Sequence, residues 1–388
     1  MLNRDTRTIP DRAGADRSSA ATARLPTYGA KTVKILLAAL VALGTTLVNI
    51  VQLALTGLLI MLATLTTAGV ASARTGANPV QYQGQNMPCP GPDVWTSGNG
   101  WYVAQCAQGT EPGRYPMYVS RDLIHWTYRA SWFGPGYGTY PSFIATPTRG
   151  RFPYWRPNVY FVGGQWINLF SARLKRSGKL VIVEAWTTNL FRGAEGATVL
   201  YNAPHASGSI DPTLAPDPQH SGDYIMAWMN FPAHIMIAGL SMQGGLHIYT
   251  NPRQISEPTL RWEGGWEEGP ILWNHDGITN LFIDANSTWS GNPTNSYAVV
   301  LEQSTNPLHG SWWKQPTQML ESGNSLDSPG MGAQPFQEYN GQWMIAFHVV
   351  CQGTRPTWIR RYLAFAPLLF NGNKPYVQGS IPPLTLLA

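Results

Sequence analysis

The chain has 388 residues, of which 44% are apolar and 12% are charged, a composition that excludes a disordered or highly charged protein. Its 39 glycines and 31 prolines indicate a body rich in turns and exclude a helical bundle. The formal net charge of +5 comes from the N-terminus, because residues 75–388 contain 18 basic and 18 acidic residues. A neutral body without a basic stripe excludes nucleic acid as the expected partner.

Residues 1–34 hold seven basic and three acidic residues and are predicted to form a disordered basic tail. Residues 35–70 contain no charge and are closed by Ala71-Ser72-Ala73, a small-x-small pattern typical of a signal peptidase site. Residues 35–73 are therefore predicted to be a hydrophobic export or anchor helix, either a long signal cut after Ala73 or an uncut membrane anchor. A buried globular helix is the third alternative, which the missing amphipathic period disfavours. Both main alternatives place the body outside the cytoplasm, with the membrane met only through this segment.

The body contains three cysteines, Cys89, Cys106 and Cys351. This number fits an oxidising compartment with at most one disulfide and one remaining thiol. The sequence leaves open which two cysteines pair.

Five segments of the body repeat one pattern, in which a Pro or Asp beside an apolar residue is followed by a Gly-containing turn and an aromatic-rich alternating run. They begin at Pro92, Pro157, Asp211, Gly269 and Gln334. Each predicts a strand, a tight turn and a second strand, and a further apolar run follows each pair. No helical pattern separates the repeats, and radial repetition of small sheets protects strand edges. The predicted fold is all-β, with one five-bladed β-propeller catalytic domain over residues 80–388.

Three of the five repeats carry an acid where the innermost strand starts, and these strands line the central channel of a propeller. The acids are Asp93 in PGPDVW, Asp211 in SIDPTL and Glu268 in WEEGPI. For any one of them a turn-capping acid is the alternative. Two carboxyl groups on opposite sides of a glycosidic bond are the minimum for its hydrolysis, and a third raises the pKa of the acid that donates the proton. Glu267 is the neighbouring candidate, but strand alternation allows only one of the two glutamates to face the channel.

These residues resemble glycoside hydrolase family 43, from about Cys89 to the end of the chain. The similar stretches are Pro92-Asp93-Val94, MYVSRDLIHW, YWRPNVYFVGGQW, Ile210-Asp211-Pro212, Glu268-Gly269-Pro270, SYAVVLEQSTNPLHGSW and RRYLAFAPLLFNGNKP. The resemblance implies an exported glycosidase that cleaves α-L-arabinofuranosyl or β-D-xylosyl linkages in hemicellulose-type polysaccharides with inversion. Its partner is then a polysaccharide or oligosaccharide, and a monomer is expected.

The resemblance also implies a role for individual residues. Asp93 is the expected general base, Asp211 the pKa modulator and orienter, and Glu268 the general acid. The expected substrate-binding residues are Trp155, Asn158, His348 and Arg361. Asn158 stands where the family has an acid, His348 has the alternative of a satisfied inner-strand histidine, and Arg361 that of a surface arginine.

The fifth repeat contains Ser328-Pro329-Gly330-Met331 where many family members have Gly-His, whose histidine holds calcium or a water cluster. Met331 is a poor ligand for a hard cation, which prefers oxygen. The sequence therefore predicts no cofactor and no metal site, with calcium as the alternative.

A second hypothesis is a catalytically inactive, carbohydrate-binding propeller in which the acids only form hydrogen bonds. Fructan hydrolases share the architecture, but their Trp-Met-Asn-Asp-Pro opening is absent, as are the boxes of sialidase propellers. The sequence leaves open the sugar, the linkage and whether attack is exo or endo.

Overall fold

The computed structural model describes Gly44 and residues 74–76, 78–108, 114–145, 154–204, 207–286, 297–321, 326–351, 361–378 and 384–386. The chain divides into two compact units, residues 1–71 and 72–388, and every element below belongs to the second. The predicted tail and, apart from Gly44, the predicted segment 35–73 lie outside the described residues. Within the described ranges, no helix is both long and apolar enough to cross a membrane.

Five antiparallel sheets follow one another along the chain. Blade 1 contains β4 (Asp93–Ser97), β5 (Trp101–Gln105), β6 (Arg114–Ser120) and β7 (Thr127–Phe133). Blade 2 contains β8 (Tyr154–Val162), β9 (Gln165–Arg173), β10 (Leu180–Thr187) and β11 (Gly196–Tyr201). Blade 3 contains β12 (Ser209–Pro216), β13 (Tyr224–Asn230) and β14 (His234–Met242), which pairs with both β15 (Leu246–Ile248) and β16 (Arg253–Ser256).

Blade 4 contains β17 (Glu267–His275), β18 (Ile278–Ala285), β19 (Ala298–Ser304) and β20 (Trp313–Lys314). In blade 5, β23 (Trp343–Cys351) pairs with β21 (Leu326–Met331), β22 (Phe336–Gln337) and β24 (Tyr362–Pro367). The remaining strands form three small pairs: β1 (Arg74–Gly76) with β27 (Leu384–Leu386), β2 (Gln81–Tyr82) with β3 (Gln85–Asn86), and β25 (Leu369–Asn371) with β26 (Lys374–Tyr376). Two short 3₁₀ helices, η1 (Leu190–Arg192) and η2 (Arg261–Glu263), lie between strands.

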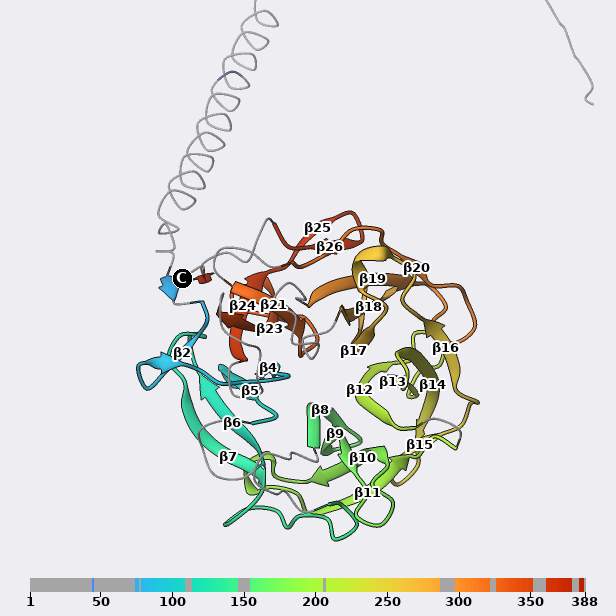
Figure 1. The fold of residues 1–388 in the computed structure, drawn as a ribbon. Coiled ribbons are helices and arrows are strands. Elements are labelled where there is room, and N and C mark those ends of the chain that lie inside the picture. The colour runs from blue at the N-terminus through green and yellow to red at the C-terminus, as the bar shows by residue number, and fades with distance from the viewer. Residues whose placement is uncertain are drawn as a thin grey trace, which may run out of the picture. The chain divides into compact units, whose positions relative to one another are not determined.

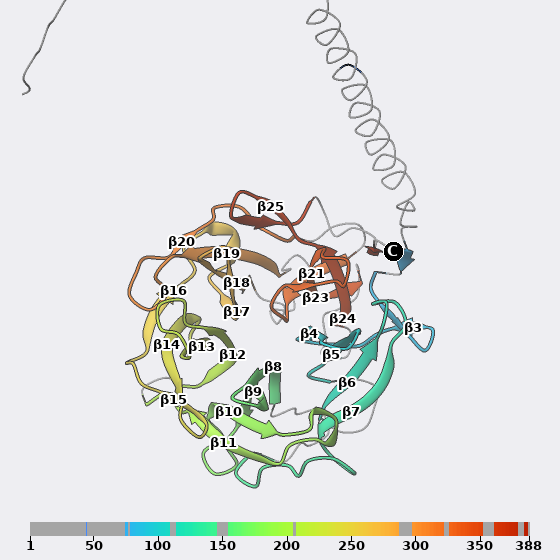
Figure 2. The ribbon, with the colours of Figure 1, turned by 180° about the vertical axis from the view of Figure 1, so that it is seen from behind.

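The five sheets surround a common centre, with β4, β8, β12, β17 and β21 innermost (Figure 1). The view from behind shows the same ring in the opposite sense (Figure 2). The fold is an all-β, five-bladed β-propeller, which confirms the architecture predicted from the repeats.

Each joint between neighbouring blades holds its own hydrophobic core. Five separate clusters occupy the joints, because alternating strand residues of one blade pack against those of the next. Trp132 fills the joint of blades 1 and 2, and Trp228 that of blades 2 and 3; both are fully buried. Burial of a large apolar side chain contributes about 1.5–3 kcal/mol, so these joints hold the ring together.

The ring closes where the segment before blade 1 pairs with the outer strand of blade 5. Backbone hydrogen bonds join Val80 and Met87 to Leu363, and Cys89 to Arg361. A disulfide links Cys89 to Cys106, which directly follows β5. The pairing that the sequence left open is therefore Cys89–Cys106, and it fastens the closing segment to blade 1.

A residue–proline pair lies within or directly before the inner strand of every blade. The pairs are Gly91-Pro92, Arg156-Pro157, Asp211-Pro212, Gly269-Pro270 and Ser328-Pro329. In blades 2 to 5 the register of the inner strand shifts across the pair, and in blade 1 the pair directly precedes β4. The pre-proline residue has a positive φ in blades 1 to 4, at 54°, 32°, 58° and 61°. Such a bulge turns a side chain out of the ladder, so this position points residues at the centre of the ring.

Candidate active site

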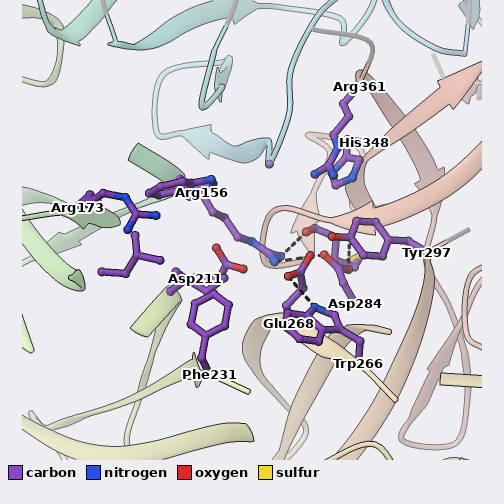
Figure 3. A pocket seen from close by; sticks show the side chains of 15 residues that line it. Arg156, Arg173, Asp211, Phe231, Trp266, Glu268, Asp284, Tyr297, His348 and Arg361 are labelled. Atoms are coloured by element: carbon purple, nitrogen blue, oxygen red, sulfur yellow. Dashed lines mark hydrogen bonds and ion pairs between the residues drawn. The ribbon is translucent and has the colours of Figure 1, made fainter. Parts of the chain in front are cut away.

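A pocket of about 530 Å³ lies at the inner strands, and both acidic and basic side chains line it. Its acids are Asp211, Glu268 and Asp284, and Figure 3 shows arginine side chains beside them. The remaining lining residues complete a polar and aromatic wall: Gly91, Trp155, Arg156, Arg173, Leu180, Ile210, Phe231, Trp266, Tyr297, Met331, His348 and Arg361. Such a concave site with a few converging polar groups is suited to a small ligand.

Asp211 enters the pocket from the bulge in β12, where it is the pre-proline residue of blade 3. Its backbone N–H donates to Ser171 Oγ at 2.7 Å, which fixes the turn that carries the side chain. Burial raises the pKa of the Asp211 carboxyl, and the nearby Arg156 guanidinium opposes this rise.

Glu268 lies at the start of β17 and faces the same pocket. Trp266 Nε1 donates to Glu268 Oε2 at 2.9 Å and fixes the carboxyl (Figure 3). Burial and, second, the charge of Asp211 raise the pKa of Glu268 to about 7, although Trp266 and the arginines oppose them. A carboxyl that keeps its proton near neutral pH is suited to act as a general acid.

Glu267 faces away from the pocket, because neighbouring strand residues alternate. Ser256 Oγ donates to Glu267 Oε2 at 2.8 Å, and Lys314 Nζ forms an ion pair with Glu267 Oε1. Of the two neighbouring glutamates, only Glu268 lines the pocket.

Asp93 is not among the residues that line the pocket. Its Oδ2 accepts a hydrogen bond at 2.5 Å from the N–H of Val159, on the inner strand of the next blade. Burial raises the pKa of Asp93 to about 8, against the lowering effects of that hydrogen bond and of Arg156. The structure therefore brings Asp211 and Glu268 to one pocket and places Asp93 at the joint of blades 1 and 2.

Arg156 is the most central charge of the site and was missed in the sequence. It is buried, and its guanidinium donates to Asp284 Oδ2 at 3.3 Å and to the carbonyl of Met331 (Figure 3). Its positive charge opposes the rise that burial causes in the pKa of four acids: Asp93, Asp211, Glu268 and Asp284. The available signal was its place before proline in YWRPNV, equivalent to Asp211 in SIDPTL.

Asp284 is the second pocket residue that sequence reasoning missed. It lies opposite Glu268 in the register of β17 and β18, and its Oδ1 accepts a hydrogen bond from Met331 N at 2.7 Å. Burial raises its pKa to about 8, while Arg156 is the main opposing charge. Asp284 could have been found from the sequence by pairing the predicted strand that carries it with the strand that carries Glu268.

Three of the four predicted substrate-binding residues line the pocket: Trp155, His348 and Arg361. Asn158 does not, because its Nδ2 donates to Pro212 O at 2.8 Å at the joint of blades 2 and 3. His348 is buried, and neither ring nitrogen has a hydrogen-bond partner among the described residues. Burial and the charge of Arg361 lower its pKa well below the usual value, so the ring is neutral.

The centre of the pocket does not fit a divalent cation. The Arg156 guanidinium already lies there against Asp284 and the Met331 carbonyl, and a second cation beside it would be repelled. Within the described ranges, no three His, Cys, Asp or Glu side chains gather as metal ligands would. Met331 offers a buried thioether, which is a soft ligand.

A propeller with a pair of carboxyl groups in a central pocket is an arrangement that glycosidases use. The family described as Glycosyl hydrolases family 43 matches residues 78–370, and the chain belongs to this family. The protein is thus a family 43 glycosidase.

Solved structures with the same fold include three enzymes of low sequence identity. A thermostable family-43 glycoside hydrolase is 19% identical with a TM-score of 0.65, over 81% of this chain and 99% of its own. An endo-1,4-beta-xylanase from Bacteroides thetaiotaomicron is 22% identical with a TM-score of 0.61, over 78% and 98%. An alpha-L-arabinofuranosidase from Lactobacillus brevis is 16% identical with a TM-score of 0.59, over 79% and 98%. A search of curated proteins found no match to the chain.

Proposed function

We propose that this family 43 glycosidase cleaves α-L-arabinofuranosyl or β-D-xylosyl linkages in hemicellulose-type polysaccharides. The observation that carries the proposal is the pair of carboxyls in the pocket, with the half-buried Glu268 at a pKa of about 7 beside the buried Asp211. The names of the xylanase and the arabinofuranosidase with the same fold support these two sugars.

In the proposed reaction, Glu268 donates its proton to the glycosidic oxygen as the bond to the anomeric carbon breaks. Asp211 acts through its charge, which keeps the proton on Glu268 until the leaving oxygen takes it. Trp266 holds the carboxyl in place during this transfer. The resulting positive charge on the sugar ring is stabilised by the acidic groups of the pocket.

Inversion further requires a carboxylate that activates water on the opposite face of the sugar. Asp93 is the residue predicted for this step from the sequence. It would have to leave the Val159 amide to reach a water in the pocket, since its Oδ2 accepts that hydrogen bond.

The pocket walls also support sugar binding. Trp155, Phe231 and Trp266 offer aromatic faces that suit the C–H faces of a sugar. His348 and Arg361 supply polar atoms for the hydroxyl groups.

Export is the second part of the proposal, with the body outside the cytoplasm as a secreted or membrane-anchored monomer. The disulfide Cys89–Cys106 supports it, because disulfides persist in oxidising compartments. The apolar run 35–70 followed by Ala71-Ser72-Ala73 supplies the export signal or the anchor.

A carbohydrate-binding propeller without turnover is the second candidate function. The observation that favours it is the Arg156 side chain, which crosses the pocket, together with the position of Asp93 at a blade joint. Binding without hydrolysis would then be the measured behaviour.

Incubation with arabinan, arabinoxylan and xylo-oligosaccharides, with the product followed by NMR, tests the proposal. We expect released arabinose or xylose, with the β-anomer appearing first from an α-linked substrate. Retention of polysaccharide without release of any reducing end would instead support the binding propeller.

A further inference from the structure

The pre-proline residue of the inner strand is the position from which the propeller aims side chains into the pocket. Gly91, Arg156 and Asp211 hold this position in blades 1 to 3, and all three line the pocket. In blade 4 the position is Gly269, and Glu268 directly before it lines the pocket. Blade 1 therefore presents a glycine where blade 3 presents a carboxylate.

The residue after the proline has a different task, which is to join blades. Asp93, Asn158 and Thr213 hold this position in blades 1 to 3. Asp93 and Thr213 each accept a hydrogen bond from a backbone N–H of the next inner strand, at 2.5 and 3.1 Å, and Asn158 donates to a backbone carbonyl there. Asp93 is thus equivalent to a threonine and an asparagine that tie blades together.

The wall at Gly91 has room for a side chain. A Cβ placed on Gly91 would lie 3.4 Å from Arg156 Cγ and 3.5 Å from its Cα, which is ordinary van der Waals contact. Its φ of 54° is close to the 58° of Asp211, and aspartate is among the residues that tolerate this conformation. A Cβ therefore fits at Gly91 without a clash, and aspartate is a residue that tolerates the strain of the positive φ.

The Arg156 side chain spans from the Gly91 position to the acids. It begins beside Gly91, and its guanidinium ends at Asp284 and against Gly269, next to Glu268. The length of the Arg156 side chain thus separates Gly91 from Gly269, which directly follows the general acid. Inverting glycosidases place their two carboxyls about 6.5–9.5 Å apart, a separation of the same order.

Resting on the proposed function, we propose that Gly91, and not Asp93, marks the position of the water-activating carboxylate, and that this position accepts a small carboxylate from outside. Among the described residues that line the pocket, Glu268 supplies the general acid. Blade 1 supplies no carboxylate there that could activate water. Wild-type turnover is then limited by unassisted attack of water.

The missing step balances with an added carboxylate as the base. A water oxygen bonds to the anomeric carbon while its proton passes to the carboxylate, the glycosidic carbon–oxygen bond breaks, and the leaving oxygen takes the proton of Glu268. The carboxylic acid so formed releases its proton to solvent, from which Glu268 takes one up. Arg156 beside the position would lower the pKa of such a carboxylate.

Turnover of 4-nitrophenyl α-L-arabinofuranoside and β-D-xyloside by the full chain tests the inference. Gly91→Asp is expected to raise kcat by about 100-fold or more, the lower end of the contribution of a general base. Gly91→Asn matches the bulk and the conformational tolerance without the charge and should give no such gain. The gain should persist in the Gly91→Asp/Asp93→Asn double variant.

The second measurement adds sodium formate to the wild-type protein, so its result does not depend on whether a variant folds. We expect a saturable rise in kcat that sodium chloride at equal ionic strength does not produce and that Gly91→Asp no longer shows. The inference is overturned if the wild type turns over without any gain from formate or Gly91→Asp, and loses that turnover in Asp93→Asn. Hydrolysis by none of these proteins, with or without formate, overturns the proposed function as well.

Discussion

Glu268 and Asp211 line one pocket, and the charge of Asp211 helps to raise the pKa of Glu268 to about 7. A general acid works only while protonated, so the rate should fall as the pH rises through this value. At the scale of single residues, the proton on Glu268 therefore sets the alkaline limit of activity.

Asp211→Asn removes the negative charge that holds this proton, and the pKa of Glu268 should fall. The alkaline limb of the kcat/KM profile is then expected to move to lower pH, which a series of rate measurements between pH 4 and 9 detects. Asp276→Asn, at an exposed acid in the turn between β17 and β18, is the matched control. An unshifted limb in Asp211→Asn would show that Glu268 does not sense Asp211.

Arg156→Met tests the buried ion pair with Asp284. Because burial holds the pKa of Asp284 at about 8, removal of Arg156 leaves a buried and largely protonated carboxyl without its hydrogen-bond donor, which typically costs about 1–3 kcal/mol. We expect a loss of this order in the free energy of unfolding by urea. The double variant Arg156→Met/Asp284→Leu should recover part of it, because both polar groups are then gone; equal losses in the two proteins would contradict the pairing.

At the scale of elements, Lys314 sets which glutamate of β17 faces the pocket. It pairs with Glu263 of η2 at 3.0 Å, with Glu302 of β19 at 3.4 Å and with Glu267. This cluster holds Glu267 on the outer side of β17, and alternation then turns Glu268 to the inner side.

Lys314→Met should destabilise the protein more as the pH rises from 5 to 8. Burial already raises the pKa of Glu267 to about 7, and loss of the Lys314 charge raises it further. The unfolded glutamate releases its proton near pH 4.3, so the folded state binds more protons in this window and loses stability as the pH rises. Urea unfolding at several pH values measures this, with exposed Lys175→Met as the control; a loss that does not depend on pH would contradict the cluster.

The repeats in the sequence located the inner strands but not the direction of each side chain. Asp93, Asp211 and Glu268 were chosen as acids near a strand start, yet they hold three different positions relative to the proline. The bulge at each proline decides which residue leaves the ladder, and this depends on backbone angles that no single motif reveals. Alignment of the five prolines shows Gly91 and Asp211 as equivalents, so this signal was present.

At the scale of the whole molecule, the fold was readable because each blade repeats one strand pattern and needs its neighbours to bury it. Asp284 and Arg156 could not be predicted in the same way, because their roles arise from contacts between blades. Arg156 of blade 2 meets Asp284 of blade 4 and Met331 of blade 5 only after the ring has closed.

The disulfide Cys89–Cys106 fastens the segment that closes the ring, so its removal should lower the stability of the whole propeller. The two cysteines are 17 residues apart, and a loop of this size contributes about 3 kcal/mol. The double variant Cys89→Ala/Cys106→Ala should therefore lower the Tm by several degrees. Dithiothreitol should lower the Tm of the wild type and leave that of the variant in place; a wild-type Tm insensitive to the reductant would contradict this role.

The dependence of Glu268→Gln on the leaving group tests the central assignment most directly. Turnover of arabinoxylan and of 4-nitrophenyl glycosides is compared in the wild type, in Glu268→Gln, and in both again on the Gly91→Asp background. We expect a loss of about 100-fold or more on arabinoxylan, whose leaving oxygen needs the proton, and a much smaller loss on nitrophenyl glycosides, whose leaving group needs little help. Equal losses on both kinds of substrate, or none, would contradict Glu268 as the general acid of the pocket.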